Sequence, residues 1–167
     1  LAMVSENDGY WSLSTKGVEP GQQYRYQITT QSGDIIEKND PRARAITNSD
    51  NGFSVVVDES FDWGDSDFRP LPKSDQVIYE LHVGTFNRPD ASTPGTFDTA
   101  IEKLDYLQDL GVTTIELMPI TSMAFSNGWG YAPNYIFSVE SMLGGRHGLM
   151  QFVKACHERN IGVILDV

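Results

Sequence analysis

The chain has 167 residues, 40% of them apolar, and a formal net charge of −11 at pH 7. This length is enough for one domain with a real core or for two small ones, and the composition is that of a globular protein. The acidic charge disfavours nucleic acids and anionic membranes as partners, because both bind basic surfaces. A neutral substrate would be indifferent to this charge.

No apolar run approaches the ~18 residues that a membrane span needs, and no signal peptide is visible, although a leader could precede Leu1. The single cysteine, Cys156, excludes an internal disulfide, so we expect a cytoplasmic protein. No cluster has zinc-ligand spacing, and the sequence has no glycine-rich phosphate loop. We therefore expect neither a metal nor a cofactor.

Residues 1–60 read as short strands separated by turn residues, which is a hairpin and sandwich pattern. Only about four strands fit, fewer than the roughly seven of a complete immunoglobulin-like sandwich. Either the β domain is unusually small or its first strands are missing. The expected strands are residues 10–14, 24–30, 35–36 and 54–57.

Residues 61–75 contain two prolines and four aspartates and follow neither a helical nor a strand period. This composition predicts a linker. Two of its aromatic residues, Trp63 and Phe68, are expected to pack the linker down between domains rather than to bind a ligand.

The run from residue 77 to residue 83 is mostly apolar or aromatic, is rich in β-branched residues and ends at Gly84, as a buried parallel strand does. Because side chains alternate along a strand, Ile78, Glu80 and His82 share one face. Polar groups therefore gather near the carboxyl end of this strand, after which a loop is expected.

Residues 97–110 have apolar side chains at intervals of three and four, which predicts an amphipathic helix on a sheet. Thr96 or Asp98 can cap its start, and Gly111 suits a left-handed residue after its end. A second apolar strand follows at residues 112–118, with Glu116 on one face. The predicted helical stripe is Phe97, Ala100, Ile101, Leu104, Leu107 and Leu110.

Residues 120–148 form a connection of a length that is more often functional than accidental. Within it, glycines beside Trp129 and Tyr131 allow a sharp turn that presents flat aromatic rings. The chain then predicts a helix at 149–159 and a third strand at 161–167.

In this last segment Cys156 falls on the apolar face of the helix and is expected to be a core thiol. His157 is expected on the helix surface near its carboxyl end. His147 is expected at the start of the helix, and Asp166 near the end of the third strand.

Strands alternating with helices predict a parallel sheet, with Glu80 and His82, Glu116 and Asp166 at the carboxyl ends of its three strands. In a (β/α)8 barrel these ends build the site, and residues 77–167 have close to three-eighths of the ~250 residues of a complete barrel. A complete small open α/β sheet remains the alternative.

The chain resembles the alpha-amylase superfamily of glycoside hydrolases, and within it glycogen branching enzymes and maltooligosyltrehalose trehalohydrolases. The barrel-like motifs are residues 77–86, 95–97, 107–112, 115–119, 129–131 and 162–167. Residues 8–11, 20–21, 24–26, 40–41 and 61–63 resemble the second half of the immunoglobulin-like domain that precedes the barrel in those enzymes.

This resemblance implies a fold of α/β plus β: a partial immunoglobulin-like sandwich (1–60), a linker (61–75), and the first three strand-helix units of a (β/α)8 TIM barrel (76–167). It implies the N-terminal portion of a retaining glycoside hydrolase or transglycosylase acting on alpha-1,4-glucan or maltooligosaccharide. The family's catalytic acids would lie beyond Val167, so we assign no catalytic residue here and expect the chain alone to be inactive.

The resemblance also implies a binding role for Tyr131, which matches a family tyrosine that stacks on sugar, as an aromatic plane suits the C–H face of a pyranose. Trp129 is expected to buttress the same loop beside the substrate, and Asp166 to orient neighbouring groups. The alternatives are loop packing for Tyr131 and a paired interior acid for Asp166. His82 and Glu116 are expected to be hydrogen-bonded interior residues.

A different class of function stays open: a stand-alone alpha-glucan-binding or interaction protein without catalysis. In a truncated barrel the first and third strands would have unpaired edges, and such edges recruit other chains. We therefore expect association with a complementary fragment or self-association.

Overall fold

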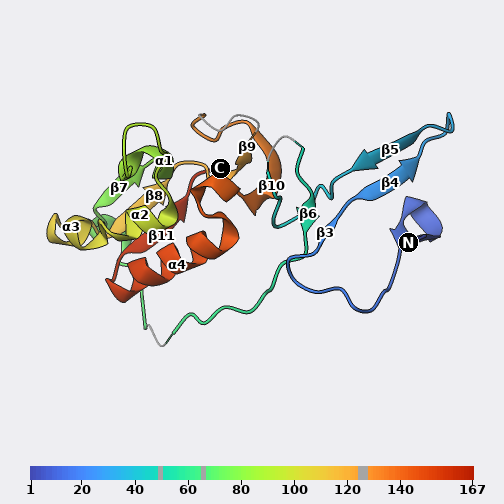
Figure 1. Cartoon of the computed structure of the whole chain (residues 1–167). Helices are drawn as coiled ribbons and strands as arrows, with labels where there is room; N and C mark the ends of the chain where they lie inside the picture. Colours follow the sequence, from blue (N-terminus) through green and yellow to red (C-terminus); the bar gives the residue numbers. More distant parts are fainter. Residues whose placement is uncertain (49–50, 65–66, 124–127) are drawn as a thin grey trace.

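The computed structural model describes residues 1–48, 51–64, 67–123 and 128–167. Two parts with different architecture follow one another along the chain (Figure 1). The first consists of pairs of short strands, and the second is a parallel sheet with helices packed against it.

The described residues of the first part form three two-stranded antiparallel sheets, β1–β2, β3–β6 and β4–β5. The predicted strand 24–30 is divided at Arg25, because its two halves pair with different partners. The β4–β5 hairpin extends away from the rest of the molecule (Figure 1). The elements are β1 Val4–Ser5, the 3-10 turn η1 Asn7–Gly9, β2 Trp11–Ser12, β3 Gln23–Tyr24, β4 Tyr26–Thr29, β5 Ile35–Lys38 and β6 Ser54–Val55.

The second part is built on a parallel sheet of order β11-β8-β7, which confirms the predicted strand directions. Tyr79 and Leu81 face the helices, whereas Glu80 lies on the opposite, open face. In register, Glu80 is the direct neighbour of Glu116. The strands are β7 Ile78–Leu81, β8 Thr114–Leu117 and β11 Gly162–Leu165, and the short turn η2 Lys73–Asp75 precedes them.

The predicted helix 97–110 is two helices, α2 Phe97–Ile101 and α3 Leu104–Asp109. Thr96, not Asp98, caps α2, in a reciprocal capping box with Thr99. The predicted stripe is buried along most of its length, but Leu110 is 58% exposed, because it lies beyond the last turn of α3.

A further helix, α1 Val83–Phe86, begins directly after β7, where the sequence predicted the end of the strand and then a loop. This correction shortens the strand to four residues. His82 is the residue between strand and helix, and its Nδ1 lies 3.2 Å from Thr85 Oγ1.

The connection 120–148 is not a continuous loop. It contains an antiparallel pair, β9 Thr121–Met123 and β10 Pro133–Val139, and the short turn η3 Ser141–Leu143. Residues 124–127 of this connection lie outside the described ranges.

The helix predicted at 149–159 is α4 Gly145–Glu158, which starts four residues earlier. Gly148 lets α4 approach α2 closely, since a Cβ there would lie 3.3 Å from Phe97 Cδ2. Cys156 is fully buried on this helix, as predicted. Within the described ranges no helix combines the length and hydropathy that crossing a bilayer requires.

The predicted linker runs along α4. Lys154 Nζ donates to the Asp62 carbonyl at 2.9 Å, and the Phe68 ring stacks on His157 with centroids 4.2 Å apart. Phe68 therefore packs the linker against α4, and His157 is half-buried rather than open on the helix surface. Trp63 stays 47% exposed, with its ring edge-on to Phe61.

Candidate functional site

Tyr131 and Asp166 meet at the carboxyl end of the parallel sheet. Asp166 immediately follows β11, and its backbone N–H donates to the Leu117 carbonyl at 3.0 Å, which continues the ladder with β8. The Tyr131 hydroxyl donates to Asp166 Oδ2 at 2.5 Å. Two residues that lie 35 positions apart in the chain therefore form one contact over the strand ends.

Acidic groups surround this contact. The pKa of Tyr131 is raised to about 12, first by the hydrogen bond to Asp166, then by loss of solvation, and then by the negative charges of Asp166, Glu80 and Glu116. The phenol therefore stays protonated, and remains a donor, over the physiological range. The three acids predicted at the strand ends thus all contribute to the electrostatic environment of the Tyr131 hydroxyl.

Glu80 and Glu116 lie side by side across β7 and β8 on the open face of the sheet. Their backbones are one strand spacing apart, about 4.8 Å. Glu80 is exposed and Glu116 is half-buried. Within the described part of the chain the Glu116 carboxylate forms no hydrogen bond, unlike the prediction, whereas the predicted bond of His82 is present.

The same open face exposes apolar side chains beside these acids. Ile78 is 50% exposed and Ile164 is 37% exposed, although both belong to strands of the central sheet. On the opposite face, which packs against the helices, Ile115 and Leu117 are fully buried. The acids and the exposed apolar residues thus share the open face of the sheet.

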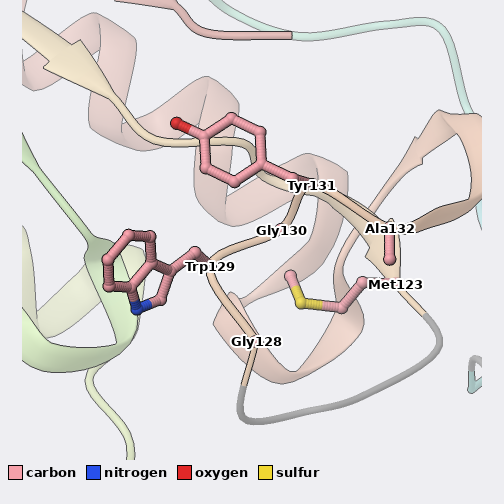
Figure 2. Close-up of a pocket in the computed structure, with 6 residues that line it drawn as sticks. All are labelled: Met123, Gly128, Trp129, Gly130, Tyr131 and Ala132. Atoms are coloured by element: carbon pink, nitrogen blue, oxygen red, sulfur yellow. The ribbon is translucent and has the colours of Figure 1, made fainter.

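A turn at Gly130 aims the two aromatic residues. Gly130 has φ +93°, and a Cβ there would lie 2.2 Å from the Pro119 carbonyl oxygen, so only glycine fits this close approach. The Trp129 and Tyr131 side chains extend from either side of it (Figure 2). They border a cavity of about 250 Å³ that is also lined by Met123, Gly128, Gly130 and Ala132.

Both rings are accessible to a ligand. Tyr131 is 56% exposed and Trp129 is 71% exposed. Most of Trp129 is thus open to solvent, rather than packed in the loop as a buttress would be. The apolar lining and flat rings of this cavity suit a ligand with an apolar face and polar edges.

Glu140 binds the backbone of Met123, which lines the cavity, and was not singled out from the sequence. It is 4% exposed, its Oε2 accepts the Met123 N–H at 3.2 Å, and its Oε1 accepts the Met142 N–H at 3.1 Å. A buried carboxylate with two backbone donors fixes the end of β9 to η3. The only sequence signal was one acid at the end of the Ile136–Val139 run.

The order and direction of the strands, with polar residues collected at their carboxyl ends, define a protein related to the β/α barrels. Residues 80–167 match the family described as "Alpha amylase, catalytic domain", which is more than half of the chain. The chain belongs to this alpha-amylase family.

Two curated relatives align over 99% of the chain. One is a malto-oligosyltrehalose trehalohydrolase of Saccharolobus solfataricus, 36% identical, and the other is a 1,4-alpha-glucan branching enzyme GlgB of Pseudoalteromonas atlantica, also 36% identical. The chain covers 28% and 24% of these proteins, so it spans about a quarter of their length.

A solved structure gives the same result in three dimensions. A Salmonella typhimurium protein assigned as an alpha amylase superimposes with a TM-score of 0.84 at 36% identity, over 99% of this chain and 27% of its own. The region around the parallel sheet is therefore barrel-related.

Proposed function

We propose that the chain is the N-terminal portion of a retaining glycoside hydrolase or transglycosylase acting on alpha-1,4-glucan, of the branching-enzyme or trehalohydrolase type. In this proposal residues 1–60 form part of an immunoglobulin-like domain and residues 61–75 a linker. Residues 76–167 supply the first three strand-helix units of a (β/α)8 barrel. The relatives' names and the share of their length that the chain covers support this proposal.

Tyr131 carries the binding role. Its ring is held over the strand ends by the 2.5 Å bond to Asp166, and this is the observation on which the proposal depends. With the hydroxyl anchored, the ring face remains free to stack on a glucose ring. Trp129 would offer a second aromatic surface one glycine away, and Asp166 would set the orientation of Tyr131.

Catalysis is not assigned to Glu80, Glu116 or Asp166. Retaining glycosidases use two carboxyl groups about 5–5.5 Å apart that flank the scissile bond, one as nucleophile and one as acid and base. The resemblance places the family's acids beyond Val167. We therefore expect this chain to bind maltooligosaccharide without turning it over.

The binding test is a calorimetric titration of the chain with maltoheptaose. Tyr131→Ala should weaken binding by about 2- to 12-fold, because an aromatic contact contributes ~0.5–1.5 kcal/mol. Tyr106→Ala is the matched control, since Tyr106 is similarly exposed, at 61%, but lies on α3. A beta-1,4-linked oligosaccharide controls for linkage. Equal losses for both tyrosine variants would contradict the proposal.

The catalytic test is prolonged incubation with maltoheptaose or glycogen, followed by product analysis. No product is expected. Turnover that disappears in Glu80→Gln or Glu116→Gln would overturn the statement that these acids do no chemistry.

We also propose that the chain self-associates, or binds a complementary fragment, through β7 and β11. Each of these strands pairs only with β8 in the described part of the chain. Their free edges present unpaired backbone donors and acceptors to solvent.

A further inference from the structure

The side-chain amide of Asn39 joins the first part of the chain to the second. Its Nδ2 donates to the Gly52 carbonyl at 2.8 Å and to the Tyr135 hydroxyl at 3.0 Å. Its Oδ1 accepts from the Ser54 N–H and from Arg25 Nε, both at 3.3 Å. Both donors and both lone pairs of the amide are thus in use, which fixes the direction of the side chain.

The partner of this amide belongs to the strand that follows the aromatic turn. Tyr135 lies in β10, opposite Ser122 of β9, and comes four residues after Tyr131. A second contact joins the same two regions, because the Arg42 guanidinium lies 5.9 Å from the centre of the Phe137 ring. Figure 1 shows β10 next to β3 and β6, where these contacts form.

Contacts on both sides hold the turn that carries Tyr131 in place. On one side Gly130 rests on the Pro119 carbonyl, and the Tyr131 hydroxyl reaches Asp166. On the other side the chain enters β10, whose position Asn39 sets through Tyr135. Because only three residues separate Tyr131 from Tyr135, a shift of β10 must be passed on to the aromatic ring.

We propose that Asn39 is a positioning residue for the sugar contact of Tyr131. It does not touch the ligand. Its amide fixes the Tyr135 hydroxyl, and β10 then holds the Tyr131 ring over the carboxyl ends of the parallel strands. The inference rests on the proposed function for the role of Tyr131, but the mechanical link from Asn39 to the turn can be measured without any ligand.

The experiment uses Tyr135→Phe, which deletes only the hydroxyl that Asn39 binds. Hydrogen exchange of the backbone amides of residues 129–132 should become about 2- to 12-fold faster, the change that corresponds to one net hydrogen bond. Exchange in α4 should be unchanged. The affinity for maltoheptaose should fall by a similar factor. Tyr106→Phe, which removes an exposed hydroxyl on α3, is the control and should change neither quantity.

A double-mutant cycle separates this link from the other bonds of the amide. Asn39→Ala also removes the bonds to Gly52, Ser54 and Arg25, so it should have a larger total effect. Its effect on exchange of residues 129–132 should be smaller in the Tyr135→Phe background than in the wild type, because the shared contact is already absent.

The outcomes distinguish the two proposals. Unchanged exchange at 129–132 in Tyr135→Phe would overturn the positioning role, whether or not the chain binds glucan. Faster exchange over the whole chain would also overturn it, because the hydroxyl would then act on overall stability. If exchange at 129–132 rises locally but the wild type binds no maltoheptaose, the link stands and the sugar-binding function fails.

Discussion

The two parts of the chain bury their side chains differently. Among the buried apolar residues of the described ranges, only Ala43 and Ile46 come from the first part, and all others lie between Leu81 and Ile161. Every residue of β4 and β5 is exposed. Helices that cross a sheet enclose a core, whereas an isolated pair of strands has too little surface to do so. Stability should therefore reside in the second part, with the first held by hydrogen bonds and the linker.

The largest expected effect tests this difference in the core. Phe152 is fully buried, and its ring centre lies 5.8 Å from that of Phe97. Phe152→Ala should lower the free energy of unfolding by ~3–5 kcal/mol. Trp11→Ala, at a 61% exposed position of β2, should change it by less than about 0.5 kcal/mol. Urea unfolding measures both, and comparable losses would mean that the first part has a core of its own.

Two glycines with positive φ give the next effect. Gly17 in the first part has φ +76°, and a Cβ added there would have no atom within 4 Å, whereas a Cβ at Gly130 would meet the Pro119 carbonyl. Alanine at either position costs ~1–2 kcal/mol for the left-handed backbone. Only Gly130→Ala should add the further ~1–3 kcal/mol of a steric overlap. Thermal unfolding measures the loss of stability in each variant. Equal losses for Gly17→Ala and Gly130→Ala would show that the turn at Gly130 can move away from Pro119.

Association should also distinguish the two parts. If the edge of β11 pairs with another copy, Leu165→Lys should weaken self-association by about tenfold, or ~1.4 kcal/mol, because lysine blocks edge pairing. Ile35→Lys in β5 changes a similarly exposed strand residue of the first part. Sedimentation over a range of concentrations is the measurement. A wild type that stays monomeric, or a loss confined to Ile35→Lys, would refute association through the parallel sheet.

The smallest effect concerns a tyrosine–aspartate pair in each part. Tyr24 donates to Asp40 at 2.7 Å, and Tyr131 donates to Asp166 at 2.5 Å. Burial is the main cause that raises the pKa of Tyr24, whereas the hydrogen bond is the main cause for Tyr131. Asp166→Asn should therefore lower the pKa of Tyr131 from about 12 towards 10, and Asp40→Asn should lower that of Tyr24 by a smaller part of its shift.

Ultraviolet titration of each variant against the corresponding tyrosine-to-phenylalanine chain assigns the signal. Since the folded-state pKa of Tyr131 is raised, its contribution to stability is complete below pH 10 and disappears as the pH rises towards 12. Loss of a larger part of the pKa shift for Tyr24 than for Tyr131 would reverse the assignment of causes.

The parallel sheet could be predicted because its strands have the simplest pattern in the chain. Alternation placed Glu80 and Glu116 each on one face of its own strand, and the structure makes them neighbours in register. The pair β9–β10 could not be predicted, since β9 has only three residues and residues 124–132 separate the two strands in the sequence. Likewise α1, at four residues, is too short for a helical period to appear.

The residues of the candidate site could be predicted individually, but their arrangement in space could not. Aromatic residues between glycines identified the turn, and the strand ends identified Asp166. Their 2.5 Å contact depends on how the turn folds back over the sheet, which no local pattern encodes. Asn39 was missed for the same reason, because an Asn before Asp40 and a proline reads as a turn, while its partner Tyr135 is 96 positions away.

Thiol labelling of the only cysteine of the chain can measure the rate at which the second part opens. Cys156 has no exposed surface, and burial raises the pKa of its thiol to about 12, so the reactive thiolate is nearly absent while α4 is packed. A thiol reagent can therefore modify the chain only when this helix lifts from the sheet. The rate of labelling therefore measures how often α4 separates from the sheet, and no engineered probe is needed.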